Sequence, residues 1–505
     1  MMRRWLTLVV AGLTVTVLAG CSLIGGTTLS TPKPGVYDPR NEKFYTQVLT
    51  WSPCDTDFTC TRVSVPVDWS APEGDTTEIA LIRHAATAET GSRGSLFVNP
   101  GGPGGSGVAL VRDSLDYAVD AELTAQFDII GFDPRGVGES DPVTCTPSSS
   151  AMDEFVYSIT PGERGSSEWL NNRRAEIEAF ASGCQKYSGA LLAHVDTLSA
   201  ARDLDVLRAA VGDEKLKFLG YSYGTLLGAL YASTFPDNVG RLVLDGAVDP
   251  TLDSSSENSS QAAGFEMSLR NWIDWCVPQE ACPFSGTTEQ AMNSIGEMIR
   301  AFEAEPVRTS DGRMLGADTF VTAIVAPLYS QDAWPYLLDM FNEYYEGSTT
   351  TAMMLADWYN GRNDDGTYED NQTEAFIAIS CLDTPASDPD SWAAEAAQLE
   401  RDAPILGRYF SYSDMACAYW PYPAVRIPAD LADTGAQPIV VIGTTGDPAT
   451  PIEWARDFVT LLHDGRLIEF SGEGHTGYNR GSTCVNDLVD EYFISDSAPP
   501  AVSSC

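Results

Sequence analysis

The segment Leu216-Lys217-Phe218-Leu219-Gly220-Tyr221-Ser222-Tyr223-Gly224 decides the fold of this chain. Its apolar first part, 216–221, is typical of a buried strand, and a Gly-x-Ser-x-Gly sequence follows at 220–224. Small residues then continue over 225–232, which favours a helix packed close to that strand. Glycines on both sides of Ser222 allow a sharp turn that lifts its hydroxyl out of the sheet. Ser222 is therefore the candidate nucleophile, although a glycine-rich turn around an ordinary serine has the same letters.

Other apolar runs of strand length lie on both sides of this segment. The two earliest runs, 62–68 and 78–84, alternate and predict antiparallel strands. Later runs of this kind occupy 96–99, 127–133, 241–245, 438–443 and 467–471, with helical periodicity over 198–211. Strands that alternate with helices predict an α/β fold with a mostly parallel sheet covered on both faces.

The chain divides into five predicted parts. Residues 1–20 are expected to be a signal peptide, and 21–45 a flexible tether rich in Gly, Thr, Ser and Pro. We expect 46–250 and 433–505 to form the two parts of one core. Residues 251–432 show helical stretches without clear buried strands, so we expect a mainly helical cap inserted between late core strands.

Charge excludes several classes of function. Acidic residues number 71 against 30 Lys and Arg, a net charge of −41. Nucleic-acid binding needs cations that face phosphates, so we expect no nucleic-acid partner. Docking on anionic lipid by charge is excluded in the same way. The four histidines lie apart from closely spaced cysteines, which makes a metal site an unfavoured interpretation, and no cofactor motif is found.

The N-terminus predicts export. Two arginines precede an apolar run of 14 residues, 6–19, which is too short for a comfortable membrane span. The sequence Leu18-Ala19-Gly20-Cys21 resembles a bacterial lipobox, which implies cleavage before Cys21 and a lipid on its thiol. We therefore expect a lipoprotein that contacts the cell membrane only through this modified cysteine; plain secretion is the alternative.

The cysteine count agrees with an oxidising location. Eleven cysteines less Cys21 leave ten, an even number that predicts five disulfides. Spacing does not fix the connectivity, but pairing of sequence neighbours is tidy. Those pairs would be Cys54–Cys60, Cys145–Cys184, Cys276–Cys282, Cys381–Cys417 and Cys484–Cys505.

A serine nucleophile needs a base and an acid. His475 lies in a glycine loop directly after the strand at 467–471, and none of the other three histidines has a comparable place after the last core strand. Asp447 follows the strand at 438–443 and would orient the imidazole. Glu453 and Asp457 are competitors that we expect on the next helix.

A glycine-rich loop, Asn99-Pro100-Gly101-Gly102-Pro103-Gly104-Gly105-Ser106-Gly107, follows an early strand. In a serine hydrolase such a loop brings a backbone N–H to the developing oxyanion. We assign one donor to the N–H of Gly102, with Gly101 as its near rival, and the other to the N–H of Tyr223. A phosphate cradle is disfavoured because the loop has no Gly-Lys-Ser/Thr ending.

These motifs in this order resemble the α/β-hydrolase fold. The detail, NPGGPGGSG at 99–107, DPRGVGES at 133–140, GYSYGT at 220–225, LDGAVDP at 244–250 and GDPATP at 446–451, resembles exported actinobacterial tripeptidyl aminopeptidases of the proline-iminopeptidase-like family. The resemblance covers nearly the whole mature chain and is weakest in the middle of the cap. It implies release of short peptides, usually three residues, from free N-termini of peptides or proteins. Prolyl aminopeptidases proper open the glycine loop with His, and Asn99 at this place favours the tripeptidyl branch.

An aminopeptidase must hold a substrate ammonium at a fixed distance from the nucleophile. Asp383 is the first candidate, because a disulfide at Cys381 would brace it, and Asp249 is the second. For each of them a solvated surface acid is the alternative. A carboxylesterase or lipase would use the same triad, and a binding protein on an inactive hydrolase scaffold is a third hypothesis. The sequence leaves the oligomeric state open.

Overall fold

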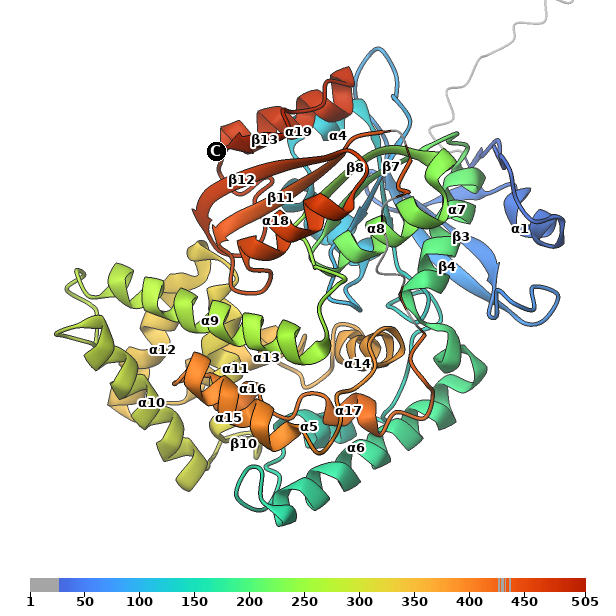
Figure 1. Ribbon diagram of the computed structural model, residues 1–505. Helices are drawn as coiled ribbons and strands as arrows, with labels where there is room; N and C mark the ends of the chain where they lie inside the picture. The colour runs from blue at the N-terminus through green and yellow to red at the C-terminus, as the bar shows by residue number, and fades with distance from the viewer. Residues whose placement is uncertain (1–26, 426, 428–430, 432, 436) are drawn as a thin grey trace, which may run out of the picture.

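The computed structural model describes residues 27–505 except 426, 428–430, 432 and 436, so the predicted signal peptide and Cys21 lie outside the described residues. Figure 1 shows a sheet with flanking helices above a separate layer of helices. The sheet has 11 strands in the order β1-β2-β3-β4-β6-β5-β7-β8-β11-β12-β13. Their bounds are Thr28–Leu29, Thr50–Asp55, Phe58–Pro66, Thr76–His84, Asp128–Phe132, Ser95–Asn99, Leu216–Tyr221, Val239–Asp245, Ile439–Gly446, Gly465–Glu473 and Val502–Ser504.

The sheet is parallel from β6 to β13 and antiparallel at its N-terminal edge. Strands β5, β7, β8, β11 and β12 pair in parallel, whereas β3 pairs with β4 and β4 with β6 in the antiparallel sense. The prediction of a mostly parallel sheet is confirmed. The carboxyl ends of β7, β8, β11 and β12 therefore meet at one edge, where loops carry functional groups in folds of this kind.

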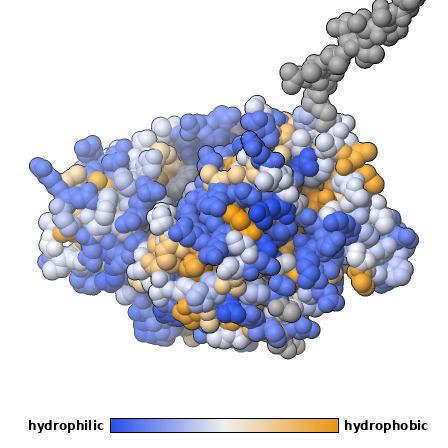
Figure 2. Space-filling view, turned by 90° about the horizontal axis from the view of Figure 1, so that it is seen from above, coloured by the Kyte–Doolittle hydropathy of each residue, from blue (hydrophilic) through white to orange (hydrophobic). Residues whose placement is uncertain are grey.

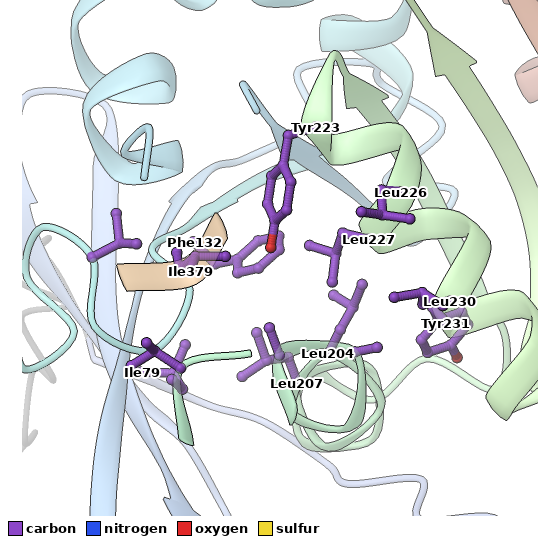
Figure 3. Packing of buried hydrophobic residues seen from close by; sticks show 14 of the residues in the cluster. Ile79, Phe132, Leu204, Leu207, Tyr223, Leu226, Leu227, Leu230, Tyr231 and Ile379 are labelled. Atoms are coloured by element: carbon purple, nitrogen blue, oxygen red, sulfur yellow. The ribbon is translucent and has the colours of Figure 1, made fainter. Parts of the chain in front are cut away.

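Helices cover both faces of the sheet, as alternation along the strands requires. Phe218 and Leu242 face one layer, which contains α7 (Thr197–Val211), α8 (Tyr223–Thr234) and α18 (Ile452–Leu461). Their neighbours Leu219 and Val243 face the other layer, formed by α2 (Gly107–Asp113), α4 (Ala121–Gln126) and α19 (Thr483–Ser495). Figure 3 shows the first layer from close by, with leucines of α7 and α8 around the ring of Tyr223.

The layer below the core is the helical cap. It is inserted between β8 and β11 and has its own apolar cluster around Trp272, Phe320 and Phe341. Its helices α9 to α17 span Ser254–Cys276, Thr288–Ala304, Ala317–Leu328, Trp334–Glu346, Thr350–Tyr359, Gln372–Asp383, Trp392–Asp402, Gly407–Phe410 and Met415–Ala418. A short hairpin, β9 (Val307–Arg308) with β10 (Met314–Leu315), completes it.

Two helices of the stretch 46–250, which we expected to form the first part of the core, belong to this lower layer. Figure 1 shows α5 (Ser149–Tyr157) and α6 (Ser167–Ser188) beside α15 and α17. Trp169 of α6 packs with Trp392 and Met415 of the later segment. The boundary at residue 251 therefore misses part of the cap, because the sequence of a helix does not reveal which layer its apolar face will meet.

The predicted tether is wrong over its described part. Thr28–Leu29 pairs with β2, and the N–H of Lys33 donates to the carbonyl of Ala209 at 2.8 Å. Helix α1 (Glu42–Tyr45) buries Phe44 and Tyr45. The polar and glycine-rich composition concealed a segment that adds an edge strand and covers α7.

Five disulfides join cysteines that are neighbours in sequence, which are the five pairs given in the sequence analysis. Most of the face in Figure 2 is hydrophilic, with apolar residues in scattered spots. Within residues 27–505, and with the gaps given above, no helix combines the length and hydropathy needed to cross a bilayer.

Candidate active site

Ser222 lies at the sharp turn between β7 and α8. Its φ of 55° and ψ of −126° are unusual for a residue with a side chain, and this strain is typical of a functional turn. Its N–H donates to the carbonyl of Asp245 on the adjacent strand at 2.8 Å. A Cβ on Gly220 would lie 2.4 Å from the carbonyl of Gly224, so the turn requires glycine there.

His475 and Asp447 are hydrogen-bonded to each other. Nδ1 of His475 lies 2.8 Å from Oδ2 and 3.0 Å from Oδ1 of Asp447. Asp447 is fully buried, and its carboxylate also accepts N–H groups of Ala449, Thr450 and Thr476. Nε2 of His475 is buried and has no hydrogen-bond partner in the described part of the chain. The imidazole is thus oriented by the acid, with its other nitrogen free to take a proton. The competitors Glu453 and Asp457 lie on α18, as expected.

Thr450 is a residue of this site to which the sequence analysis gave no role. Its hydroxyl lies 2.9 Å from Oδ2 of Asp447 and 3.3 Å from Nδ1 of His475. The hydroxyl therefore touches both members of the pair. Thr450 lies in the GDPATP motif at 446–451, which the sequence analysis noted. A threonine three residues after the candidate acid Asp447 has no distinctive spacing, so the motif alone did not indicate its role.

The glycine loop approaches the nucleophile closely. A Cβ on Gly101 would lie 2.9 Å from Cβ of Ser222 and 3.0 Å from the backbone nitrogen of Tyr223. The N–H of Gly101 donates to Oδ1 of Asn99 at 3.1 Å, whereas we find no partner within the described residues for the N–H of Gly102 or of Tyr223. This difference favours Gly102 over Gly101 as a donor to an oxyanion.

Asp245 connects the turn at Ser222 to the loop after His475. While its carbonyl accepts the Ser222 N–H, its buried carboxylate accepts the N–H groups of Gly477 and Tyr478, at 2.8–3.0 Å, in the loop after His475. Burial raises the pKa of Asp245 to about 6, against the opposing effect of those hydrogen bonds. The carboxylate therefore holds the loop after His475 against the end of β8, next to Ser222.

The two candidate amine-binding acids are already engaged. Asp383 is buried and accepts hydrogen bonds from the N–H and the hydroxyl of Thr197. Oδ1 of Asp249 accepts the N–H and hydroxyl of Thr251. Both oxygens of Asp383 and one oxygen of Asp249 thus accept local hydrogen bonds, and the amine-binding role of either residue stays a prediction. A spacing argument could not have revealed these local partners.

The cap contacts the histidine loop directly. Tyr329, which follows α11, accepts the N–H of His475 through its carbonyl at 2.8 Å, and its ring lies 5.6 Å from the imidazole. Ser330 pairs with Gly474 in an isolated antiparallel β-bridge. Elsewhere, a cavity of about 220 Å³ lies between 146–152 and 360–374, and its lining does not include Ser222, Asp447 or His475.

Comparisons with known proteins agree with this geometry. Residues 94–479 match the family model described as alpha/beta hydrolase fold. Serine protease Hip1 of Mycobacterium tuberculosis is 33% identical over 100% of this chain and 98% of its own length. Carboxylesterase B of the same organism is 34% identical over 96% of both chains. Tripeptidyl aminopeptidase of Streptomyces coelicolor is 30% identical over 90% of this chain and 86% of its own.

The family model covers more than half of the chain, and the relatives align with nearly all of it. The suspected family and the predicted α/β-hydrolase fold are thereby confirmed. The chain belongs to the alpha/beta-hydrolase family, in the group that includes serine protease Hip1 and the tripeptidyl aminopeptidases.

Proposed function

We propose that this protein is a serine exopeptidase that releases short peptides, in particular tripeptides, from free N-termini. The observation that carries the proposal is the pair of His475 and Asp447, which leaves Nε2 of the imidazole free at the edge of the sheet where Ser222 turns outward. The names of two relatives, serine protease Hip1 and tripeptidyl aminopeptidase, support peptides as the class of substrate.

In the first half of the reaction, Oγ of Ser222 attacks the carbonyl carbon of the third residue while Nε2 of His475 takes its proton. The negative charge moves to the carbonyl oxygen, where the N–H groups of Gly102 and Tyr223 donate to it. When the carbon–nitrogen bond breaks, the imidazolium gives its proton to the leaving amine. Asp447 stabilises the imidazolium throughout this half-reaction.

In the second half, water takes the place of the leaving amine. Nε2 accepts a proton from the water as its oxygen attacks the acyl carbon, and the proton passes to Oγ of Ser222 when the ester bond breaks. The tripeptide leaves with a new carboxylate. Hydrolysis restores the free hydroxyl and the neutral imidazole.

A chromogenic tripeptide amide, offered with a free and with an acetylated N-terminus, tests the proposal. An aminopeptidase is expected to cleave only the free form, whereas an esterase would ignore the acetyl group and favour short acyl esters. Carboxylesterase B among the relatives makes the second function the one to exclude. Ser222→Ala should abolish both cleavage and labelling by a fluorophosphonate; activity that survives in this variant would refute the assignment of the nucleophile.

We further propose that Cys21 attaches the exported protein to the cell membrane. The lipobox sequence at 18–21 supports this, and the five disulfides suit an oxidising compartment. Cys21→Ala, expressed in an actinobacterial host, should move the protein from the detergent phase to the aqueous phase in a Triton partition. Equal partition of the variant and the wild type would refute the anchor.

A further inference from the structure

The ring of Tyr329 connects the catalytic histidine to a second aromatic side chain. The Tyr329 ring meets the His475 imidazole edge-on at 5.6 Å, and it also contacts the rings of Phe265 at 5.4 Å and Tyr359 at 6.1 Å. Tyr359 is the last residue of α13 and lies in the cap. A continuous row of rings therefore runs from the imidazole into the cap.

Tyr359 is the accessible end of this row. It is 44% exposed, whereas Tyr329 is half-buried between the imidazole and the cap. The row of rings thus ends in an aromatic surface that a substrate side chain can reach.

The direction of proton transfer identifies what this surface meets. His475 hands its proton to the nitrogen of the leaving amine, so that nitrogen must come within hydrogen-bond reach of Nε2. The acyl part of the substrate is bound to Oγ of Ser222, so the residue that leaves must lie next to the imidazole. The ring of Tyr329 contacts this imidazole from the cap, and the row of rings begins there.

We infer that Tyr329 and Tyr359 form the subsite for the first residue on the leaving side of the scissile bond, and that this subsite selects an apolar or aromatic side chain. The inference rests on the proposed acyl-enzyme at Ser222. Aromatic faces pack favourably against apolar groups and against other rings, and they offer no partner to a carboxylate. A small residue such as glycine would leave the surface of Tyr359 in water.

Capture of the acyl-enzyme by an added amine tests the subsite. An acyl ester first forms the enzyme ester at Ser222, and phenylalanine amide or glycine amide then competes with water. A carbon–nitrogen bond forms and the ester bond breaks, while the amine proton passes through Nε2 of His475 to Oγ of Ser222. We expect phenylalanine amide to be captured roughly tenfold better than glycine amide. The preference should fall to about one in Tyr359→Ala and be kept in Tyr359→Phe.

Matched measurements separate folding, function and subsite. Tyr336, which is 52% exposed on α12, provides the control Tyr336→Ala, and this variant should keep the wild-type preference. Titration with a fluorophosphonate gives the fraction of folded sites in each variant. Because an ester supplies the acyl group, the experiment works even if the enzyme proves to be an esterase. Equal capture of the two amides by the wild type, or an unchanged preference in Tyr359→Ala, would overturn the inference.

Discussion

Asp383, the last residue of cap helix α14, is bound to Thr197, the first residue of core helix α7. Its carboxylate accepts both the N–H and the hydroxyl of Thr197, and that hydroxyl also contacts the phenol of Tyr223. Figure 3 shows Tyr223 beside Ile379 of the same cap helix. A buried row of polar groups thus joins the cap to the residue that follows the nucleophile. Asp383 therefore joins the two layers, whereas its predicted role in binding a substrate amine stays a prediction.

This contact should make stability depend on pH. Burial is the main cause that raises the pKa of Asp383 to about 7; Asp196 adds to the rise, and the hydrogen bonds from Thr197 oppose it. An unfolded aspartate titrates near pH 3.9, so the folded state holds an extra proton between about pH 4 and 7. The free energy of unfolding therefore falls as pH rises through that window.

The asparagine of Asp383→Asn does not titrate, so this variant does not lose stability as the pH rises through the window. The difference in free energy of unfolding between the variant and the wild type should therefore shift in favour of the variant from pH 4.5 to 7.5, by on the order of a few kcal/mol. Thermal unfolding of both proteins across this range measures the difference. Asp388→Asn, at an exposed position of the following loop, should stay parallel to the wild type. A constant difference between Asp383→Asn and the wild type would contradict the expectation.

Thr450 should matter for the rate and little for substrate binding. Its hydroxyl touches both Asp447 and His475, and valine keeps its shape while removing these contacts. We expect Thr450→Val to lower kcat roughly 10- to 100-fold with little change in KM, because the imidazole loses orientation and not substrate contacts. Thr445→Val, which removes an exposed hydroxyl near the end of β11, is the control. A change confined to KM would refute this role.

How much of this site could be read from the sequence differs between its parts. Ser222, Asp447 and His475 follow strand ends, so chain order and the parallel sheet were enough to bring them to one edge. Thr197 and Tyr329 were not predicted, because each acts through a contact between segments far apart in the chain and carries no local pattern. The range 149–188 was included in the core for the same reason: apolar residues in a helix indicate that one face is buried, but they do not indicate which layer it packs against.

Asp245 should position the histidine loop against the nucleophile. Replacement by alanine removes the acceptor of the Gly477 and Tyr478 N–H groups and leaves both donors buried without a partner, at a cost of about 1–3 kcal/mol each. We expect kcat to fall well below wild type in Asp245→Ala and by less in Asp245→Asn, which keeps one accepting oxygen. Rates are to be given per site titrated by fluorophosphonate.

The pH profile separates positioning by Asp245 from mere stability. Because its pKa is raised to about 6, protonation below that pH removes part of the acceptor, so kcat should decline on the acid side. His475 and Arg480 face this carboxylate and favour its charged form. The decline attributable to Asp245 should be missing in Asp245→Asn. An identical acid limb in both proteins would show that it does not come from Asp245.

Gly101 should tolerate no side chain, because neighbouring atoms occupy the position of a Cβ; its positive φ matters less. A Cβ there would lie 2.4 Å from the carbonyl of Tyr221 and 2.9 Å from Cβ of Ser222, so the glycine loop would have to move off the nucleophile. We expect Gly101→Ala to lower kcat by about 10²–10³, the loss that removal of one oxyanion donor produces. Gly91 shares the positive φ but has no atom within 4 Å of its Cβ position. Gly91→Ala should therefore cost only about 1–2 kcal/mol of stability and leave kcat unchanged. Equal activity of the two variants would show that the close approach of Gly101 to Ser222 is dispensable for catalysis.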